Sequence, residues 1–86
     1  MEKVVEILND EGLHARPAGI FAKVAGEYQS EIELEFNGNK VNAKSVMTLM
    51  SLGLKKGAQI KIIAEGSDAE IALGALTTLV SNKFQS

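Results

Sequence analysis

The residues best suited to chemistry lie in one short segment, residues 12–18, which reads GLHARPA. It contains His14, the only histidine of the chain, and a neutral imidazole nitrogen is a good nucleophile near neutral pH. Arg16, two residues further on, supplies a permanent planar cation that suits phosphate oxygens. The combination indicates a histidine that binds an anion or accepts a phosphoryl group. Taken alone, the same two residues are also compatible with an exposed helix cap and a surface charge.

A helix that begins at residue 15 would place His14 at its N-terminus. Pro17 and Ala18 then belong to the first turn, where the missing N–H of proline breaks no intrahelical hydrogen bond. The N–H groups of a first turn have no partner within the helix and, together with the helix dipole, favour an anion at that end. A phosphoryl group on His14 would therefore meet donors that are already in place. A metal site is not expected, because a single histidine without a cluster of carboxylates is a poor one.

The composition predicts one compact, cytosolic and monomeric domain over residues 1–86. Its 45% hydrophobic and 23% charged residues suit a chain with a core rather than a disordered one. With 9 basic and 11 acidic residues the net charge is −2, which argues against a general nucleic-acid binder. The apolar runs are far shorter than the roughly 20 residues that span a bilayer, and a secretory signal is not expected. The absence of cysteine excludes disulfides and thiolate chemistry.

Periodicity divides the chain into alternating strands and helices. Polar and apolar residues alternate along residues 31–36, which predicts a strand with Ile32, Leu34 and Phe36 on the core. The Asn-Gly-Asn sequence that follows tolerates positive φ and so predicts a tight hairpin. The expected strands are residues 3–8, 31–36, 40–43 and 59–64, and the expected helices are residues 15–28, 46–51 and 69–83.

Apolar residues recur at helical spacing in residues 15–28 and 69–83, so each of these two helices has one side to bury. Ser67 or Asp68 is expected to cap the second of them, and Ser45 to cap the short helix. The order β-α-β-β-α-β-α predicts an α+β fold, an open-faced two-layer β-sandwich. In it, a four-stranded, mainly antiparallel sheet is covered on one face by three helices.

The short helix raises a second question, because it carries more apolar residues than one buried side can take. Leu49 and Leu52 are placed to face the sheet. The remaining apolar residues are either core or an exposed, flexible patch that suits docking to several partners. The residues of this candidate partner-binding surface are Val46, Met47 and Met50 in the short helix and Ala15, Ile20 and Lys23 in the first long helix.

Two segments carry a resemblance to a known family. Residues 12–19, GLHARPAG, resemble the active-site signature of the HPr family, the histidine-phosphorylated carriers of the bacterial sugar phosphotransferase system. Residues 42–53, NAKSVMTLMSLG, resemble the second signature of that family, which surrounds a regulatory serine. The element order, the length and the Ala-Glu-Gly turn at residues 64–66 are similar as well. The resemblance therefore covers essentially the whole chain.

This resemblance implies a phosphocarrier rather than an enzyme, with no cofactor or metal of its own. His14 would be phosphorylated on Nδ1, with Arg16 as the charge partner of the phosphoryl group. The group would come from enzyme I, which phosphoenolpyruvate phosphorylates, and would pass to a histidine of sugar-specific IIA domains. The candidate partner-binding surface would serve both enzyme I and the IIA domains, and neither nucleic acid nor membrane insertion is implied.

Ser45 is implied to be the regulatory serine of Gram-positive-type members of the family. There an ATP-dependent HPr kinase/phosphorylase modifies it, and the phosphoserine form acts as a corepressor with the catabolite control protein in catabolite repression. Without the resemblance, Ser45 is simply a helix cap worth about 1 kcal/mol.

Two other functions fit the residues less well. A regulatory HPr-like paralogue would not transfer phosphate, but such paralogues lack the active-site histidine, whereas this chain has His14. An unrelated ligand- or RNA-binding domain would need an aromatic platform or a basic face. Three Phe, one Tyr and a negative net charge supply neither.

Overall fold

The structure is a computed structural model that describes residues 1–85. Its elements follow the expected β-α-β-β-α-β-α order, with boundaries that agree to within about two residues. In chain order, they are β1 (Glu2–Glu6), α1 (Ala15–Gly26), β2 (Glu31–Phe36), β3 (Asn39–Asn42), α2 (Val46–Ser51), β4 (Gln59–Glu65) and α3 (Ala69–Ser81).

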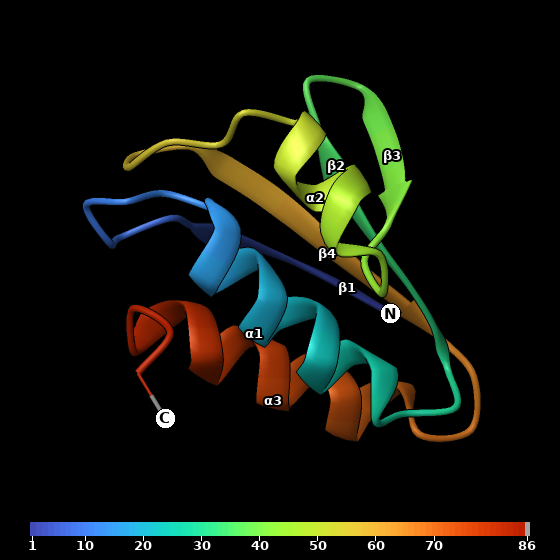
Figure 1. Ribbon diagram of the computed structural model, residues 1–86. Coiled ribbons are helices and arrows are strands. Elements are labelled where there is room, and N and C mark those ends of the chain that lie inside the picture. Colours follow the sequence, from blue (N-terminus) through green and yellow to red (C-terminus); the bar gives the residue numbers. More distant parts are fainter. Residues whose placement is uncertain (86) are drawn as a thin grey trace.

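The four strands form one sheet in the order β1-β4-β2-β3, and every neighbouring pair is antiparallel. The helices α1 and α3 lie side by side on one face of the sheet, and α2 packs against α1 and β3 (Figure 1). The expected open-faced α+β sandwich is therefore confirmed. On the opposite face Glu31 and Glu33 are exposed, as the alternation in β2 predicted, whereas Glu35 is half-buried.

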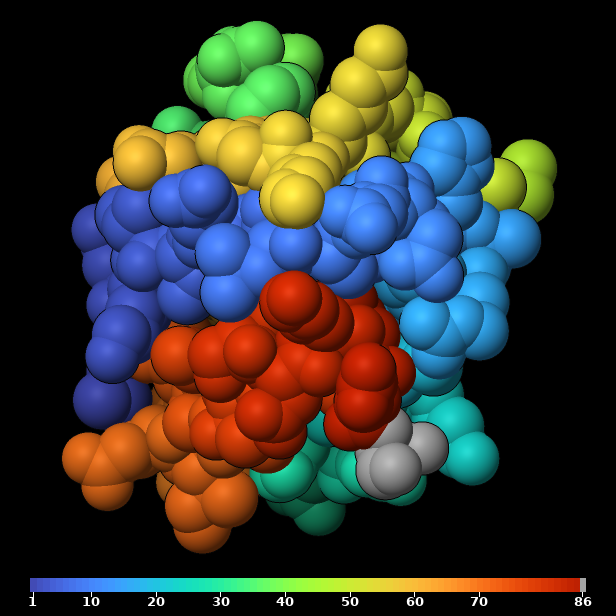
Figure 2. Space-filling model, turned by 90° about the vertical axis from the view of Figure 1, so that its left-hand side faces the viewer, coloured from blue at the N-terminus to red at the C-terminus, as the bar shows by residue number. Residues whose placement is uncertain are grey.

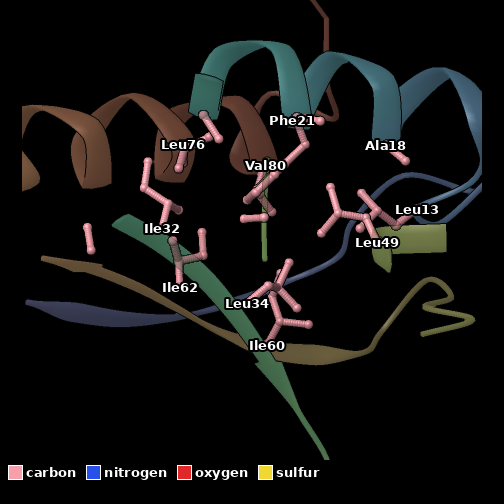
Figure 3. Packing of buried hydrophobic residues seen from close by; sticks show 14 of the residues in the cluster. Leu13, Ala18, Phe21, Ile32, Leu34, Leu49, Ile60, Ile62, Leu76 and Val80 are labelled. Carbon is pink, nitrogen blue, oxygen red and sulfur yellow. The ribbon is translucent and has the colours of Figure 1, made fainter. Parts of the chain in front are cut away.

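The core fills the space between the sheet and the two long helices. Ile32 and Leu34 of β2 and Ile60 and Ile62 of β4 point toward the helices (Figure 3). Burying one such side chain stabilises the fold by about 1.5–3 kcal/mol. Their main counterparts on the helices, all of them buried, are Ala18, Phe21, Leu76 and Val80.

The hairpin between β2 and β3 is a two-residue turn, as its sequence predicted. Asn37 and Gly38 both have positive φ, 52° and 82°, and Phe36 pairs with Asn39 across the turn. The return strand begins and ends one residue earlier than expected. Ala43 nevertheless remains attached, because its N–H donates to the Ile32 carbonyl over 2.9 Å.

The C-terminal residues turn back into the core, which the periodicity of α3 did not predict. Lys83 and Phe84 have positive φ, 57° and 62°, so the helix ends and the chain reverses direction there. Phe84 is fully buried, and its ring lies 6.5 Å from that of Phe21, measured between centroids. The end of the described chain is thus held beside α1.

The expected capping of α3 is only half right. Asp68 occupies the N-cap position, but its side chain makes no hydrogen bond to the helix. Its carboxylate instead accepts hydrogen bonds from the N–H groups of Gln29 and Ser30, each over 2.9 Å, and from the Ser30 hydroxyl. The side chain therefore connects the loop after α1 to the loop before α3.

Among residues 1–85 no helix has the length and apolar character to cross a membrane.

The hydrogen bonds of the Asp68 carboxylate make the stability of the fold depend on pH. The hydrogen bonds from the Ser30 side chain and the Gln29 N–H lower the pKa of the Asp68 carboxyl below its usual value. A carboxyl with a lower pKa in the folded state stabilises the fold above its unfolded pKa, and the contribution is lost as pH falls through the folded value. We expect Asp68→Asn to melt lower at pH 7 and to lose less stability than the parent protein between pH 7 and about pH 3.

Thermal unfolding at both pH values measures this effect. Glu70→Gln, which neutralises an exposed carboxylate two residues away, is the matched control. An acid-induced fall in melting temperature that is as large in Asp68→Asn as in the control would contradict this account of the carboxylate.

Candidate functional site

His14 is the N-cap residue of α1, as the position of Pro17 predicted. Its backbone is extended (φ −86°, ψ −164°), and its carbonyl accepts a hydrogen bond from the Ala18 N–H over 2.8 Å. Its imidazole makes no capping hydrogen bond, and the residue is exposed. The ring is therefore accessible to a partner molecule at the end of a long helix.

The helix offers unpaired donors at the same end. The N–H groups of Ala15 and Arg16 have no hydrogen-bond partner within residues 1–85, and Pro17 has no N–H. In α1, which the structure describes throughout, the first turn contains no acidic residue. Unpaired N–H groups and the helix dipole both favour an anion there. The geometry thus suits a negatively charged group carried by His14.

The loop before His14 is held by backbone contacts with the loop before β4. Leu13 is buried, and its N–H donates to the Leu54 carbonyl over 3.1 Å. Gly12 has φ +66°, and a Cβ atom at this position would lie 2.3 Å from the Leu54 carbonyl oxygen. Figure 2 shows the loop before α1 (blue) between the loop before β4 (yellow) and the C-terminal residues (red). The exposed histidine therefore follows a loop that is packed against and hydrogen-bonded to the loop before β4.

Asn9 closes this loop from within. Its side chain is buried, and Nδ2 donates to the Gly12 carbonyl over 2.7 Å and to Glu11 Oε1 over 3.3 Å. The Gly12 N–H in turn donates to the Asn9 carbonyl over 3.1 Å. These bonds form a tight turn whose side-chain partner the sequence reasoning did not identify. The available signal was the Asn-x-x-Gly spacing, which is typical of turns.

Arg16 is not free at this site. Its Nη2 lies 3.4 Å from Glu11 Oε2, and its Nη1 donates to the Phe84 carbonyl over 3.5 Å. The side chain of Arg16 remains 57% exposed, so its guanidinium is accessible from solvent to an approaching anion. Glu11 is a site residue that sequence reasoning missed. The two residues are five apart across the boundary between loop and helix, a spacing that no helical pairing rule covers.

Glu11 remains ionised near neutral pH. The hydrogen bond from the Asn9 side chain, followed by those from its own backbone and from Arg16, lowers the pKa of the Glu11 carboxyl. The site therefore contains one guanidinium that is already paired with a carboxylate.

Ser45 caps α2, as expected. Its hydroxyl oxygen accepts a hydrogen bond from the Thr48 N–H over 3.5 Å, and its carbonyl accepts one from the Leu49 N–H over 3.1 Å. Gly53 follows the helix with φ +62°, which ends it where the sequence indicated. Ser45 is half-buried, so part of the residue faces solvent at the start of this short helix.

The apolar residues of α2 are partly buried and partly exposed, which agrees with the interpretation of Val46, Met47 and Met50 as an exposed patch. Leu49 is fully buried, whereas Met47 is 78% exposed. Val46 and Met50 are also exposed, so the interpretation of these three residues as core is wrong. On α1, Ala15 and Lys23 are exposed and Ile20 is half-buried against the core. Because α1 and α2 pack against each other, these residues lie on two adjoining helices.

The residues from which a metal site could be built are not grouped. Within residues 1–85, no three His, Cys, Asp or Glu side chains are placed to hold one metal ion. The polar groups that the structure describes at this end of α1 are the side chains of His14, Arg16 and Glu11 and the unpaired N–H groups of the first turn.

The whole chain is similar to known proteins of one family. A family model described as "PTS HPr component phosphorylation site" matches residues 1–82. The structure of HPr-C-His from Thermoanaerobacter tengcongensis is 48% identical, with a TM-score of 0.95, over 98% of this chain and 94% of that one. Phosphocarrier protein HPr from Bacillus anthracis is 45% identical, with a TM-score of 0.90, over 93% and 95%. Crh, a catabolite repression protein of Bacillus subtilis seen as a domain-swapped dimer, is 41% identical, with a TM-score of 0.79, over 95% and 94%.

The contact at Gly12 yields a prediction about the support of His14. Gly12→Ala combines a left-handed backbone with a collision against the Leu54 carbonyl, and we expect it to lower the free energy of unfolding by about 2–4 kcal/mol. The matched control is Gly53→Ala, because Gly53 has a similar φ of +62° and open space around its Cβ position. That variant should lose only about 1–2 kcal/mol. Urea denaturation measures both, and equal losses would show that the close approach is unimportant.

Proposed function

The chain belongs to the PTS HPr family, and on that premise we propose that its His14 accepts a phosphoryl group from phospho-enzyme I and passes it to sugar-specific IIA domains. The observation that supports this proposal is the exposed imidazole of His14 beside the unpaired N–H groups of the first turn of α1. Phosphorylation needs an accessible nucleophile, and the phosphoryl group that is then attached needs nearby hydrogen-bond donors. The N-terminus of α1 offers both.

The proposed step is an in-line displacement between two imidazole rings. A lone pair on a ring nitrogen of neutral His14 forms a bond to phosphorus while the bond from phosphorus to the donor imidazole breaks. The electron pair of the broken bond stays on the departing ring nitrogen. When the donor ring carries a proton on its other nitrogen, it leaves as a neutral imidazole. The chain is thus consumed and regenerated as a protein substrate, and it turns nothing over by itself.

The surrounding groups act by position and charge. Phosphoryl transfer leaves little covalent work for the protein beyond alignment and charge stabilisation. In this proposal the N–H groups of Ala15 and Arg16 donate to phosphoryl oxygens, and the Arg16 guanidinium adds charge-assisted hydrogen bonds. Because Arg16 is more than half exposed, it can reorient toward the phosphoryl group without disturbing the core.

The transfer itself provides the decisive test. With enzyme I and labelled phosphoenolpyruvate, the parent protein should take up an acid-labile label, and His14→Ala should take up none. His14 is exposed and makes no side-chain hydrogen bond to the helix, so the variant should keep its stability to within about 0.5 kcal/mol. A folded His14→Ala that is labelled to the same extent would exclude His14 as the carrier.

Arg16→Lys keeps the charge but loses the planar fork, so we expect transfer to slow by about tenfold.

We propose further that the exposed apolar residues of α2 form the surface on which enzyme I and the IIA domains dock. Val46, Met47 and Met50 are exposed side chains of α2, which packs against α1, the helix whose N-cap residue is His14. Adaptable methionines suit a surface that must fit several partners. Lys23 and Arg16 add positive charge on α1, which suits partners with an acidic rim. These partners act in the cytoplasm, which is the location that we propose for this chain.

Ser45 is the proposed site of regulatory phosphorylation by an HPr kinase/phosphorylase, with the phosphorylated chain as a corepressor of the catabolite control protein. The similarity to Crh, a catabolite repression protein, is compatible with this role. Crh also leads to the alternative proposal, a regulatory paralogue that does not transfer phosphate. The presence of His14 favours the carrier, and the labelling assay separates the two proposals. Sedimentation would test the proposed monomer against a swapped dimer.

The position of Ser45 predicts how its phosphorylation would act. A charge at the N-terminus of α2 is favoured by the free N–H groups there, so the fold should not be weakened. The same charge lies beside Val46 and Met47, on the surface that a partner must desolvate. We therefore expect Ser45→Asp to keep its melting temperature and to slow phosphoryl transfer from enzyme I by about tenfold.

Ser67→Asp is the matched control for this prediction. Ser67 is exposed, and it also lies just before a helix, α3, in the loop after β4. The substitution adds the same charge away from α2 and should leave the transfer rate unchanged. A Ser45→Asp variant that melts markedly lower, or that transfers as fast as the control, would refute this electrostatic account.

A further inference from the structure

We infer that Glu11 is a positioning residue that competes with the phosphoryl group for Arg16, and that it thereby favours passing the group on over keeping it. The inference rests on the proposed function of His14. Glu11 precedes α1 and lies outside the GLHARPA segment, and the inference is based on its contacts with Arg16 and Asn9.

The geometry ties Glu11 to both the cation and the loop. Oε2 of its carboxylate lies 3.4 Å from Arg16 Nη2, while Oε1 accepts a hydrogen bond from Asn9 Nδ2 over 3.3 Å. The Asn9 side chain is only 3% exposed and also bonds the Gly12 carbonyl, so it cannot follow a moving Glu11. The carboxylate is thus anchored to the same turn that leads to His14.

The other contacts of Arg16 make Glu11 its only anionic partner among residues 1–85. The second contact of the guanidinium is the neutral carbonyl of Phe84, over 3.5 Å. No other ion pair of Arg16 occurs in the described chain. Glu11 is also held ionised, since hydrogen bonds from Asn9 and Arg16 lower the pKa of its carboxyl. Before transfer, the Arg16 guanidinium is therefore already paired with one carboxylate, that of Glu11.

Competition between two anions for one guanidinium has a predictable sign. When the phosphoryl group arrives on His14, Arg16 either gives up Glu11 or is shared between two negative groups that repel each other. Either way the phosphorylated form gains less from Arg16 than it would without Glu11. A carrier must donate its phosphoryl group as readily as it accepts it, so a weaker hold on the group favours its release to the next protein.

The chain offers a matched control in the neighbouring residue. Asp10 also forms an exposed ion pair, with Lys56, over 3.1 Å. It lies on the same turn and carries the same charge, and its carboxylate has no contact with Arg16 among residues 1–85. Asp10→Asn therefore removes one nearby negative charge without releasing the arginine, whereas Glu11→Gln does both. Glutamine keeps an oxygen that can accept the Asn9 hydrogen bond, so the turn should remain closed.

The experiment measures the equilibrium of phosphoryl exchange between enzyme I and each variant, with labelled phosphoenolpyruvate as the source. We expect Glu11→Gln to shift the equilibrium toward the phosphorylated chain by about two- to fivefold, the size expected for one exposed ion pair. The shift should shrink as salt is raised. Asp10→Asn should shift it by less than about half as much. Melting temperatures of both variants should stay close to that of the parent protein. If Glu11 had a purely structural role, Glu11→Gln would instead lower the melting temperature and leave the phosphoryl-exchange equilibrium unchanged.

A double-mutant cycle with Arg16→Ala completes the test. If Glu11 acts through Arg16, the excess effect of Glu11→Gln over Asp10→Asn should disappear in the Arg16→Ala background. An equal effect of the two carboxylate substitutions, or an excess that persists without Arg16, would overturn the inference while leaving the proposed function intact. If the parent protein takes up no label on His14, the proposed function falls and the inference falls with it.

Discussion

The apolar face of the sheet is the surface on which the rest of the molecule depends. Ile32, Leu34, Ile60 and Ile62 are buried there under α1 and α3, and the only alternative for these side chains is water. Their burial fixes which side of α1 faces the sheet, because Ala18, Phe21 and Ala22 on that side are buried with them. With α1 held in this way, His14 lies at its N-terminus, outside the core. The exposed histidine is thus a consequence of packing elsewhere in the structure.

The two proposed phosphorylation sites use the same property of helices in different ways. His14 and Ser45 are both N-cap residues, and both helices have free N–H groups that favour an anion. The Ser45 hydroxyl already accepts a hydrogen bond from its helix, whereas the His14 ring accepts none. The Ser45 side chain contributes to the stability of its helix, whereas the His14 side chain makes no hydrogen bond within residues 1–85 that phosphorylation would break. The difference suits regulatory phosphorylation at Ser45 and repeated transfer of a phosphoryl group at His14.

Charge around His14 is organised by α1, by the loop that precedes it and by the C-terminal segment, which is distant in sequence. Arg16 of α1 lies between Glu11 of the preceding loop and the carbonyl of Phe84 after α3. The fully buried ring of Phe84 holds that carbonyl in place, and Asn9 holds Glu11. The guanidinium is therefore positioned by neighbours that are themselves anchored in the core. Such an arrangement keeps the cation near the helix start while leaving it exposed enough to turn toward a new anion.

Local pattern was sufficient for the elements, the hairpin, the cap of α2 and the position of His14 at the start of α1. Alternation in β2, the Asn-Gly turn and the proline in the first turn of α1 depend on neighbours within a few residues, so the sequence by itself determines them. Side-chain contacts across loops and between distant segments were beyond such patterns. The Asp68 carboxylate bonds the loop after α1 instead of its own helix, Phe84 returns to the core, and Arg16 pairs with Glu11. Only the tertiary structure decides these contacts, because a polar side chain chooses among the partners that packing brings within reach, and packing is a property of the whole chain.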